Sequence, residues 1–468
     1  MKHAGNVFHH AAVVLLTAVI AAFLLGELTK PKFYNDNYWP LDVTYQGFYE
    51  MEKDSVDVLF LGSSHAISSF SPQELYNTCG IRSFNLSSEE QSLLVSYYWL
   101  KEALRTQSVK AVVLDTIVLF PYMDTPYNCN ESAVRKALDP MRWSDVKFAA
   151  VRDLHRLDGQ ETLASFLFPV IRYHARWNDL GPNDIRFWPP QNTSLKGYAV
   201  LSEDSGIEDF KPVVISDAEP AGTNSRMMEY LDKITALCKE KGIELILVST
   251  PYSEATDASH NAVAAYASQN GLTFINFNEA SVYDRLDFDF AHDMADAGHA
   301  NTSGAVKLTD YIGGVLKEKG IDSAADSQYE TSRAYCARQI KNANLYRIQD
   351  FNEFYGELDL DEYLIFVTGE GPEYASMVNL PDAVKGPFAS LLDGDAAETY
   401  ESDHSSWRMK ENLNYKLHPG QEGAFIQVYD QRYDSPGGLQ VVILDKEKGY
   451  VIDHSCFNLQ GERIQPNS

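Results

Sequence analysis

Short apolar runs alternate along the chain with longer segments in which apolar residues recur at helical spacing. The short runs are typical of buried parallel strands and the longer segments of amphipathic helices. Strands and helices that alternate in this way predict an open parallel α/β sheet with right-handed crossovers. We expect strands within residues 54–64 and at residues 83–86, 111–114, 243–248 and 273–275, and helices at residues 90–104, 227–241, 258–269 and 302–319.

Two stretches interrupt this alternation. Residues 121–224 contain several Pro, Trp and Tyr residues and predict a long irregular insertion. Residues 323–332 are small and polar, and predict a linker to a second domain. Beyond the linker the apolar runs are β-type, and residues 445–449 predict a hairpin loop between the last two runs. We expect an α/β domain at residues 31–325 and a smaller, mostly β domain at residues 326–468, with strands at 363–367, 425–429, 439–444 and 450–457.

The N-terminus contains one strongly apolar segment. Residues 11–25 are apolar except for one Thr, Val7 and Phe8 extend the run, and Lys2 supplies a cationic flank. The run counted from Val7 approaches the length needed to cross the roughly 30 Å hydrocarbon core of a membrane. No small-residue cleavage site follows it. Residues 1–30 are therefore expected to be an uncleaved signal anchor that leaves the rest of the chain outside the cytoplasmic membrane; a cleaved signal peptide and a buried core helix are the alternatives.

The charge balance and the cysteines narrow the possible partners. The 468 residues carry 39 Lys and Arg against 66 Asp and Glu, a net charge of −27, which would repel phosphate backbones. No nucleic-acid partner is expected. The five Cys residues include no C-x-x-C pair, so we expect no zinc site, no other metal and no cofactor, while a disulfide between Cys79 and Cys129 stays open. One acidic run lacks the spacing of a calcium loop and is expected to form a solvated face: Asp284, Asp287, Asp289 and Asp293.

The first candidate for chemistry lies where the first predicted strand ends. Residues 61–66 read Leu-Gly-Ser-Ser-His-Ala. In an open parallel sheet, ligands bind at the carboxyl ends of the strands. A serine at this turn has its hydroxyl at the sheet edge, with backbone N–H groups close by that can stabilise an oxyanion. The spacing differs from the G-x-S-x-G elbow of α/β-hydrolases, and small residues here also fit an ordinary tight turn.

The second candidate lies immediately before the last predicted helix of this domain. Asp296 and His299 are three residues apart. A carboxylate at that spacing can accept the imidazole Nδ1–H, which leaves Nε2 free to take a proton from a serine hydroxyl. A capping or surface pair is the alternative for these two residues.

Together and in this order, the two sites resemble the SGNH (GDSL-like) hydrolases. The resemblance covers residues 54–320 in separate blocks and favours the membrane-anchored branch related to the D-alanine transfer protein and to polysaccharide O-acetylation proteins. It implies a flavodoxin-like three-layer sandwich, with Ser64 rather than Ser63 as nucleophile, His299 as base and Asp296 as third triad member. Residues 299–307 resemble the His-x-Asn-x-x-Gly-Ala-x-Lys run of this branch.

The chain departs from the family pattern at the second and third blocks. Ser87 stands where a Gly commonly helps to form the oxyanion hole, so its backbone N–H and the nearby Asn85 are the expected contributors. The third-block Asn is not recognisable after residues 111–114, where Asp115 follows, a loss that the transferase-like members share. His65 is expected to shape the turn or to contact substrate, because it is too close in sequence to Ser64 to reach round to its Oγ.

Two other regions carry a resemblance. Residues 173–177 and 196–198 resemble segments of the same branch, and four side chains are expected to line a polysaccharide groove or else to brace the insertion: His174, Arg176, Trp177 and Lys196. Residues 437–445 and 449–457 resemble the ending of the interleukin-like EMT inducer domain, in a match that covers residues 340–458. The resemblance implies a carbohydrate-binding role supported by Tyr429, Tyr433 and Trp407; an unrelated β appendage is the alternative.

These observations predict a membrane-tethered, extracytoplasmic serine acyl-ester enzyme that modifies a cell-surface polysaccharide. Acetyl is the expected acyl group, either transferred or hydrolysed. The resemblance implies a multipass membrane O-acyltransferase as the partner that supplies the acyl group. A non-catalytic glycan-binding scaffold is the alternative outside the enzymes.

Overall fold

The computed structural model describes residues 2–32, 41–159, 162–185, 195–359, 361–369, 374, 377, 398–402, 413–418, 424–429, 431–446 and 450–464. The chain forms two compact units, Met1–Cys336 and Ala337–Ser468, which are described separately below. The boundary falls inside helix α15 (Ser327–Asn344), whereas the sequence places it at residues 325 and 326.

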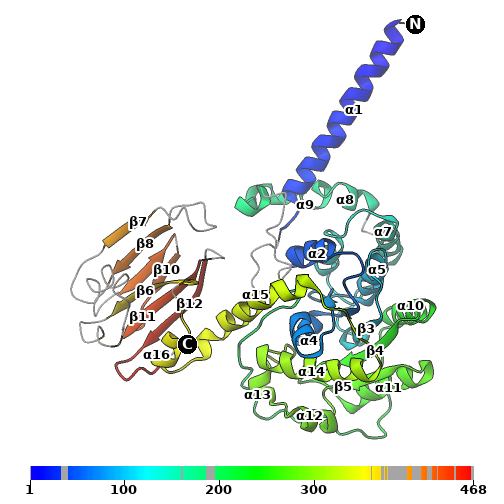
Figure 1. The fold of residues 1–468 in the computed structure, drawn as a ribbon. Coiled ribbons are helices and arrows are strands. Elements are labelled where there is room, and N and C mark those ends of the chain that lie inside the picture. Colours follow the sequence, from blue (N-terminus) through cyan, green and yellow to red (C-terminus); the bar gives the residue numbers. More distant parts are fainter. Residues whose placement is uncertain are drawn as a thin grey trace. The chain divides into compact units, whose positions relative to one another are not determined.

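The first unit is built on a parallel sheet, as predicted, with five strands in the order β2-β1-β3-β4-β5 (Figure 1). The chain runs from β1 outward to β2 and then crosses back to β3 on the other side of β1. Because the connection direction reverses between β1 and β3, this point is where an open α/β sheet binds its ligand. The strands are β1 (Val58–Leu61), β2 (Ser83–Asn85), β3 (Ala111–Asp115), β4 (Glu244–Ser249) and β5 (Thr273–Asn276).

Helices cover both faces of the sheet because successive strand residues point to opposite sides. Leu59 and Leu61 of β1 belong to one buried apolar cluster, and Val58 and Phe60 belong to a second. The first cluster is covered by α5 (Leu93–Ala103), α10 (Ser225–Lys241) and α11 (Asp257–Asn270). The second is covered by α3 (Ser64–Ser69), α4 (Pro72–Cys79), α12 (Ala280–Leu286), α13 (Phe290–Asp293) and α14 (Thr302–Glu318).

The insertion after β3 contains more helix than its sequence suggested. Helix α7 begins after Ser144, whose side chain accepts from Lys147 N, and ends at Gly159, which has a φ of +72°. These are ordinary helix start and stop signals. The prediction of an irregular stretch was therefore wrong for α6 (Glu131–Leu138), α7 (Asp145–Asp158), α8 (Leu163–Leu167), α9 (Val170–Tyr173), η2 (His174–Asp179) and η3 (Pro182–Ile185). The short helix η1 (Ile117–Leu119) lies just before this stretch.

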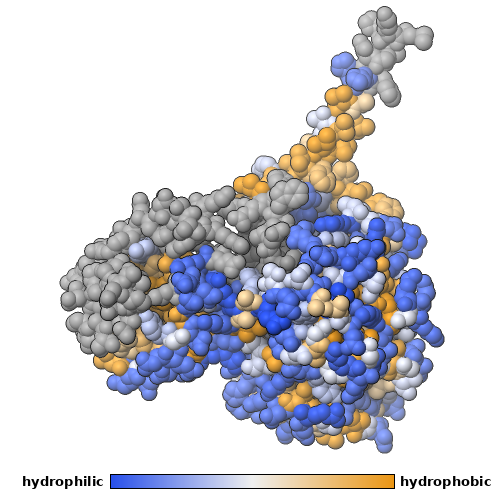
Figure 2. Space-filling model, viewed as in Figure 1, coloured by the Kyte–Doolittle hydropathy of each residue, from blue (hydrophilic) through white to orange (hydrophobic). Residues whose placement is uncertain are grey.

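Helix α1 (Lys2–Thr29) extends away from the sheet, and Figure 2 shows its surface as mostly hydrophobic. Its segment His9–Thr29, 21 residues with a mean hydropathy of 2.4, is long and apolar enough to cross a membrane. Most of its side chains are exposed, which contradicts the alternative of a buried core helix. Helix α2 (Leu41–Glu50) follows.

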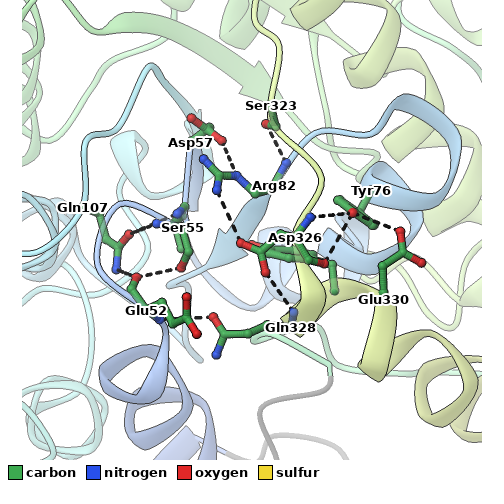
Figure 3. Close-up of polar contacts among 12 residues, drawn as sticks. Glu52, Ser55, Asp57, Tyr76, Arg82, Gln107, Ser323, Asp326, Gln328 and Glu330 are labelled. Atoms are coloured by element: carbon green, nitrogen blue, oxygen red, sulfur yellow. Dashed lines mark hydrogen bonds and ion pairs between the residues drawn. The ribbon is translucent and has the colours of Figure 1, made fainter.

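The predicted linker is instead packed onto the first unit. Arg82 donates through Nε to Asp57 Oδ2 at 2.7 Å and through Nη1 to Asp326 Oδ2 at 3.4 Å (Figure 3). Tyr329 is fully buried, and its hydroxyl donates to the carbonyl of Ser83 at 2.8 Å. The small polar residues of this stretch therefore hold the start of α15 in place rather than forming a flexible connection.

The second unit is mostly antiparallel β structure, as predicted, with one sheet in the order β12-β11-β6 and another in the order β10-β9-β8-β7. Trp407 lies outside the described residues. The strands are β6 (Tyr363–Gly369), β7 (Glu398–Ser402), β8 (Leu413–His418), β9 (Phe425–Val428), β10 (Gln431–Asp434), β11 (Leu439–Asp445) and β12 (Tyr450–Phe457), and the short helices are η4 (Leu345–Arg347) and α16 (Phe351–Gly356).

The five cysteines all lie in the described part of the chain, and none of them is in a disulfide. Cys79 and Cys129 therefore form no disulfide. Burial raises the pKa of the Cys129 thiol well above its usual range, so this group is unreactive at neutral pH.

Candidate active site

The serine turn lies at the switch point of the sheet. Strand β1 ends at Leu61, Gly62 makes the turn, and Ser63 caps helix α3 through a hydrogen bond that its Oγ accepts from His65 N at 3.4 Å. A Cβ on Gly62 would lie 2.7 Å from the Cβ of Asp115, which explains why glycine is required here. The next residue, Ser64, opens the helix with its hydroxyl at the carboxyl end of the sheet.

The structure brings Ser64, His299 and Asp296 together although 235 residues separate the serine from the histidine. His299 Nε2 lies 2.8 Å from Ser64 Oγ. His299 Nδ1 lies 2.8 Å from Asp296 Oδ2 and 2.9 Å from Oδ1. With a carboxylate at Nδ1, the proton of a neutral imidazole resides on that nitrogen, and Nε2 is left to accept from the serine. These distances allow a proton to pass from the serine hydroxyl to an imidazole that a carboxylate orients.

The Asp296 carboxylate is held ionised. Its partial burial raises the pKa, but hydrogen bonds from His299 and from Gly298 N outweigh that effect and bring the pKa to about 2. The Oδ1 atom also accepts from the backbone N–H of His299 at 2.9 Å. The carboxylate therefore orients the imidazole and the loop that carries it.

The loop before α14 is fixed by residues of the His-x-Asn-x-x-Gly run. Asn301 caps the helix, since its Oδ1 accepts from the N–H groups of Ser303 and Gly304 at 3.0 and 3.2 Å. A Cβ on Gly304 would lie 2.1 Å from the carbonyl oxygen of Asp293. Lys307 Nζ donates to Asp293 Oδ2 at 2.7 Å. These residues of the run therefore hold the loop that carries His299, and none of them is among the residues that line the cavity described below.

The same contacts correct one expectation about the acidic run. Asp284, Asp287 and Asp289 are exposed, as expected. Asp293 is instead buried, paired with Lys307, and accepts from Asp289 N at 2.7 Å, so it belongs to the framework of the loop. Among the residues that the structure describes, no group of His, Cys, Asp and Glu has a metal-binding arrangement.

Ser64 and His299 open into a cavity of about 490 Å³. One wall is apolar and comes from residues 117–121, which follow β3. Two carboxylates, Glu90 and Glu254, also line the cavity, and its described lining includes no Lys or Arg. Glu254 accepts from the hydroxyl of Tyr252 at 2.9 Å. The cavity is therefore suited to an uncharged or cationic ligand.

His65 lines the cavity beside Ser64. Its ring centroid lies 5.1 Å from that of His299 and 5.3 Å from that of Tyr252, and its Nδ1 is buried without a hydrogen-bond partner. Burial first, and then the neighbouring His299, lower the pKa of His65 to about 3. A neutral imidazole that does not bond to Ser64 shapes the wall of the site, and a side chain on Gly298 would displace it.

The expected oxyanion contributors are occupied elsewhere. Asn85 donates through Nδ2 to the carbonyls of Ala66 and Phe70 at 2.9 and 3.1 Å, which ties β2 to helix α3. Its Oδ1 accepts from Ser87 N at 3.2 Å, so the N–H of Ser87 is already used. Neither residue lines the cavity. The structure therefore places neither residue at the cavity, and the N–H of Ser64, at the first position of α3, is a donor that lies beside the Ser64 hydroxyl.

The predicted groove residues do not gather at the cavity either. Arg176 donates to the carbonyl of Thr29 at the end of α1 and to Asp184, so it braces the insertion. Lys196 is buried, donates to Gln73 at 3.3 Å and lies over the ring of Tyr329. His174 and Trp177 are exposed on η2, and none of the four lines the cavity.

Asp115 is a residue of the site that sequence reasoning treated only as a departure. It ends β3 fully buried beneath the serine turn, accepting from Ser63 Oγ at 3.4 Å and from Thr250 Oγ1 at 3.3 Å. Burial raises its pKa to about 6 although these hydrogen bonds lower it. The sequence feature that could have pointed to Asp115 is its position: a carboxylate directly after a predicted buried strand, next to the switch point of the sheet.

The raised pKa of Asp115 predicts a pH-dependent contribution to stability. The folded state binds this proton more tightly than the unfolded state, so the contribution is fully present below about pH 4 and is lost as the pH rises through about 6. The difference from the ordinary value of 3.8 corresponds to roughly 3 kcal/mol. Urea denaturation gives the free energy of unfolding at pH 4 and at pH 7. We expect this free energy to fall less between the two pH values in Asp115→Asn than in the wild type. The exposed Asp124→Asn is the control, and identical losses in wild type and Asp115→Asn would contradict the assignment.

No protein-family model and no curated protein matches the chain. Among solved structures, it is similar to a GDSL-like lipase from Bacteroides thetaiotaomicron, with 12% identity, a TM-score of 0.28, and 59% of this chain and 99% of the other covered. It is also similar to a putative acylhydrolase from Bacteroides fragilis, with 12% identity, a TM-score of 0.28, and 59% and 94% covered. The class of fold defined by the sheet order is a flavodoxin-like α/β sandwich with a serine site at its switch point.

Proposed function

We propose that the protein is a serine acyl-ester enzyme of the SGNH type. The observation that carries this proposal is the hydrogen-bonded series from Ser64 Oγ through His299 to Asp296, open to a cavity at the switch point of the sheet. If Asp296 and His299 formed only a surface pair, nothing would require the Ser64 hydroxyl to lie against His299 Nε2. A capping role is already filled by Asn301 at the start of α14.

The geometry supports a two-step acyl transfer. Ser64 Oγ attacks the acyl carbonyl while His299 Nε2 takes the hydroxyl proton, and Asp296 stabilises the imidazolium that forms. The developing oxyanion is held by the N–H of Ser64. His299 then returns the proton to the departing sugar oxygen, leaving an acyl group on Ser64. A water or an acceptor hydroxyl then attacks the acyl-enzyme and gives its proton to His299. His299 passes that proton to Ser64 Oγ as the bond between Oγ and the acyl carbon breaks, which restores the free serine.

The substrate we propose is an acetylated, uncharged cell-surface polysaccharide. Glu90 is held by Asn130, whose Nδ2 donates to its Oε2 at 2.6 Å, and Tyr252 bonds to Glu254. Two fixed carboxylates in one cavity disfavour an anionic sugar by electrostatic repulsion. The apolar wall at residues 117–121 offers a surface for the acetyl methyl group and for a sugar face.

The location we propose is the outer face of the cytoplasmic membrane, with α1 as a single anchor. A multipass membrane O-acyltransferase is the partner proposed from the family resemblance, as the source of the acyl group when the reaction runs as a transfer. For the second unit we propose glycan binding on the same basis, with Tyr429 and Tyr433 as candidate contacts. Loss of binding to cell-wall glycans in Tyr433→Ala of the full chain would support that role.

The proposed function is tested with purified full-length protein and acetylated oligosaccharides. We expect acetate release, or acetyl transfer to an added acceptor glycan, to be faster with neutral oligosaccharides than with uronate oligosaccharides by roughly ten-fold. Replacing Glu90 and Glu254 together by Gln is expected to narrow this preference. Glu318→Gln, at the exposed end of α14, is the matched control.

The outcomes separate the possible reactions. Acetyl transfer to the acceptor identifies a transferase, and release to water alone identifies an esterase. A folded protein that binds glycans but turns over no ester in either assay would contradict the proposal in favour of a scaffold.

A further inference from the structure

The insertion carries a group of exposed apolar side chains around the end of α1. We call residues 162–185, which contain α8, α9, η2 and η3, the collar. Its elements lie around the end of α1 that enters the first unit (Figure 1). Four of its apolar side chains are between 40% and 69% exposed: Leu167, Ile171, Trp177 and Ile185. The catalytic proposal assigns them no role.

The collar is attached directly to the last turn of α1. Arg176 Nη1 donates to the carbonyl of Thr29 at 2.6 Å, and Lys32 Nζ donates to the carbonyl of Asp184 at 3.0 Å. Gly26 packs against Pro169, because a Cβ at that glycine would lie only 2.8 Å from Pro169 Cδ. These contacts fix the level of the collar along the helix axis.

That level coincides with the edge of a membrane spanned by α1. The 21 residues His9–Thr29 are about 31 Å long at 1.5 Å per residue, close to the roughly 30 Å hydrocarbon core. Thr29 therefore lies at the boundary between hydrocarbon and headgroups. Pro169 packs three residues deeper, about 4.5 Å along the axis. Ile171 and Trp177 are exposed on α9 and η2, the elements that contact α1 here, and would then face lipid.

The charge of the collar agrees with this placement. The whole chain has a net charge of −27, whereas the collar contains two Arg and two Asp and is neutral. Electrostatic repulsion from anionic headgroups is therefore absent where the protein would approach them most closely. Trp177 is 58% exposed, and tryptophan is the residue that favours the membrane–water interface.

We propose that the collar is inserted into the headgroup region of the membrane that α1 spans, as a second and peripheral attachment of the first unit. The occupant of this apolar surface is the lipid bilayer. Burial of the exposed side chains in the interface then holds the first unit in one orientation toward the membrane, which a single helix does not do alone. The proposal rests on the anchoring by α1 and is independent of the acyl-ester chemistry.

The test uses full-length protein in phosphatidylcholine–phosphatidylglycerol vesicles, with the partly exposed Cys79 replaced by Ser and single cysteines introduced for a fluorescent label. The positions are Ile171→Cys in the collar, Ile20→Cys in α1 and Val214→Cys. Val214 adjoins α12, at the opposite end of the first unit from α1 (Figure 1). Brominated phosphatidylcholine is the quencher, with bromine near the headgroups or near the chain ends.

We expect Ile171→Cys to lose fluorescence mainly with bromine near the headgroups, Ile20→Cys to lose it mainly with deep bromine, and Val214→Cys to be unaffected. If Ile20→Cys is quenched but Ile171→Cys behaves like Val214→Cys, the collar is not in lipid and faces water or a protein partner instead, which overturns the proposal. If neither label is quenched, the anchoring fails and the proposal fails with it. Ester turnover measured on the same samples reports separately on the proposed function.

Discussion

Replacement of Ser64 by Ala is expected to lower acyl-ester turnover by on the order of 10⁴–10⁶-fold, because it removes the hydroxyl that would form the acyl intermediate. His299 Nε2 lies 2.8 Å from Ser64 Oγ, and the variant removes that oxygen without changing the helix start. The measurement is kcat/KM for an aryl acetate with purified full-length protein.

The neighbouring Ser63→Ala is the matched control for this prediction. Ser63 caps α3 and contacts Asp115, so its loss is expected to cost about 1 kcal/mol of stability and to leave most of the turnover. Turnover that survives in Ser64→Ala but disappears in Ser63→Ala would reassign the nucleophile.

Asp296→Asn is expected to lower kcat by about 10²–10⁴-fold with little change in KM. An amide presents an N–H to His299 Nδ1 and thereby favours the tautomer whose Nε2 carries the proton and cannot accept from Ser64. Since the pKa of Asp296 is held at about 2, the wild-type carboxylate stays ionised far below neutral pH. At pH values above 3.8, the ordinary pKa of this group, the ionised carboxylate stabilises the folded state. This contribution is lost only as the pH falls through about 2.

The chain offers a close control in a second pair with the same spacing. His292 Nδ1 lies 2.7 Å from Asp289 Oδ2, three residues apart and exposed. Asp289→Asn keeps the capping oxygen of α13 and is expected to leave kcat unchanged. An equal loss of kcat in the two variants would show that the effect is structural rather than catalytic.

This second pair shows what sequence reasoning can and cannot decide. Both Asp-x-x-His pairs precede the last helix of the α/β unit, and spacing alone does not separate them. The run from His299 through Asn301 to Gly304 separates them, and the structure gives the physical reason. Asn301 caps α14 and Gly304 allows its close approach to Asp293, so the loop presents His299 to the end of β1.

The strands and the serine turn were predictable because their signals are local. Apolar runs of β type followed by Gly62, Ser63 and Ser64 specify a buried strand and a tight turn without reference to distant residues. The helices of the insertion had local cap signals as well, at Ser144 and Gly159, but the Pro and aromatic content masked them.

Some residues make contacts in the folded structure that differ from the sequence-based expectation. Ser87 was expected to offer a free N–H, but the side chain of Asn85 occupies it. Arg176 is a sugar-groove candidate by sequence, yet its partner is the carbonyl of Thr29, 147 residues away in the chain. The small polar residues before α15 signal a linker, yet Asp326 pairs with Arg82. A single sequence does not show which distant group will meet a polar side chain.

The central claim is that Ser64 is an activated nucleophile. The most direct measurement is labelling of the folded full-length protein with a fluorophosphonate probe, followed by peptide mapping of the adduct. The account predicts an adduct on Ser64 in the wild type and in Ser63→Ala, and no adduct in Ser64→Ala or His299→Ala. A folded wild-type protein that takes up no probe, or an adduct that persists in Ser64→Ala, would contradict it.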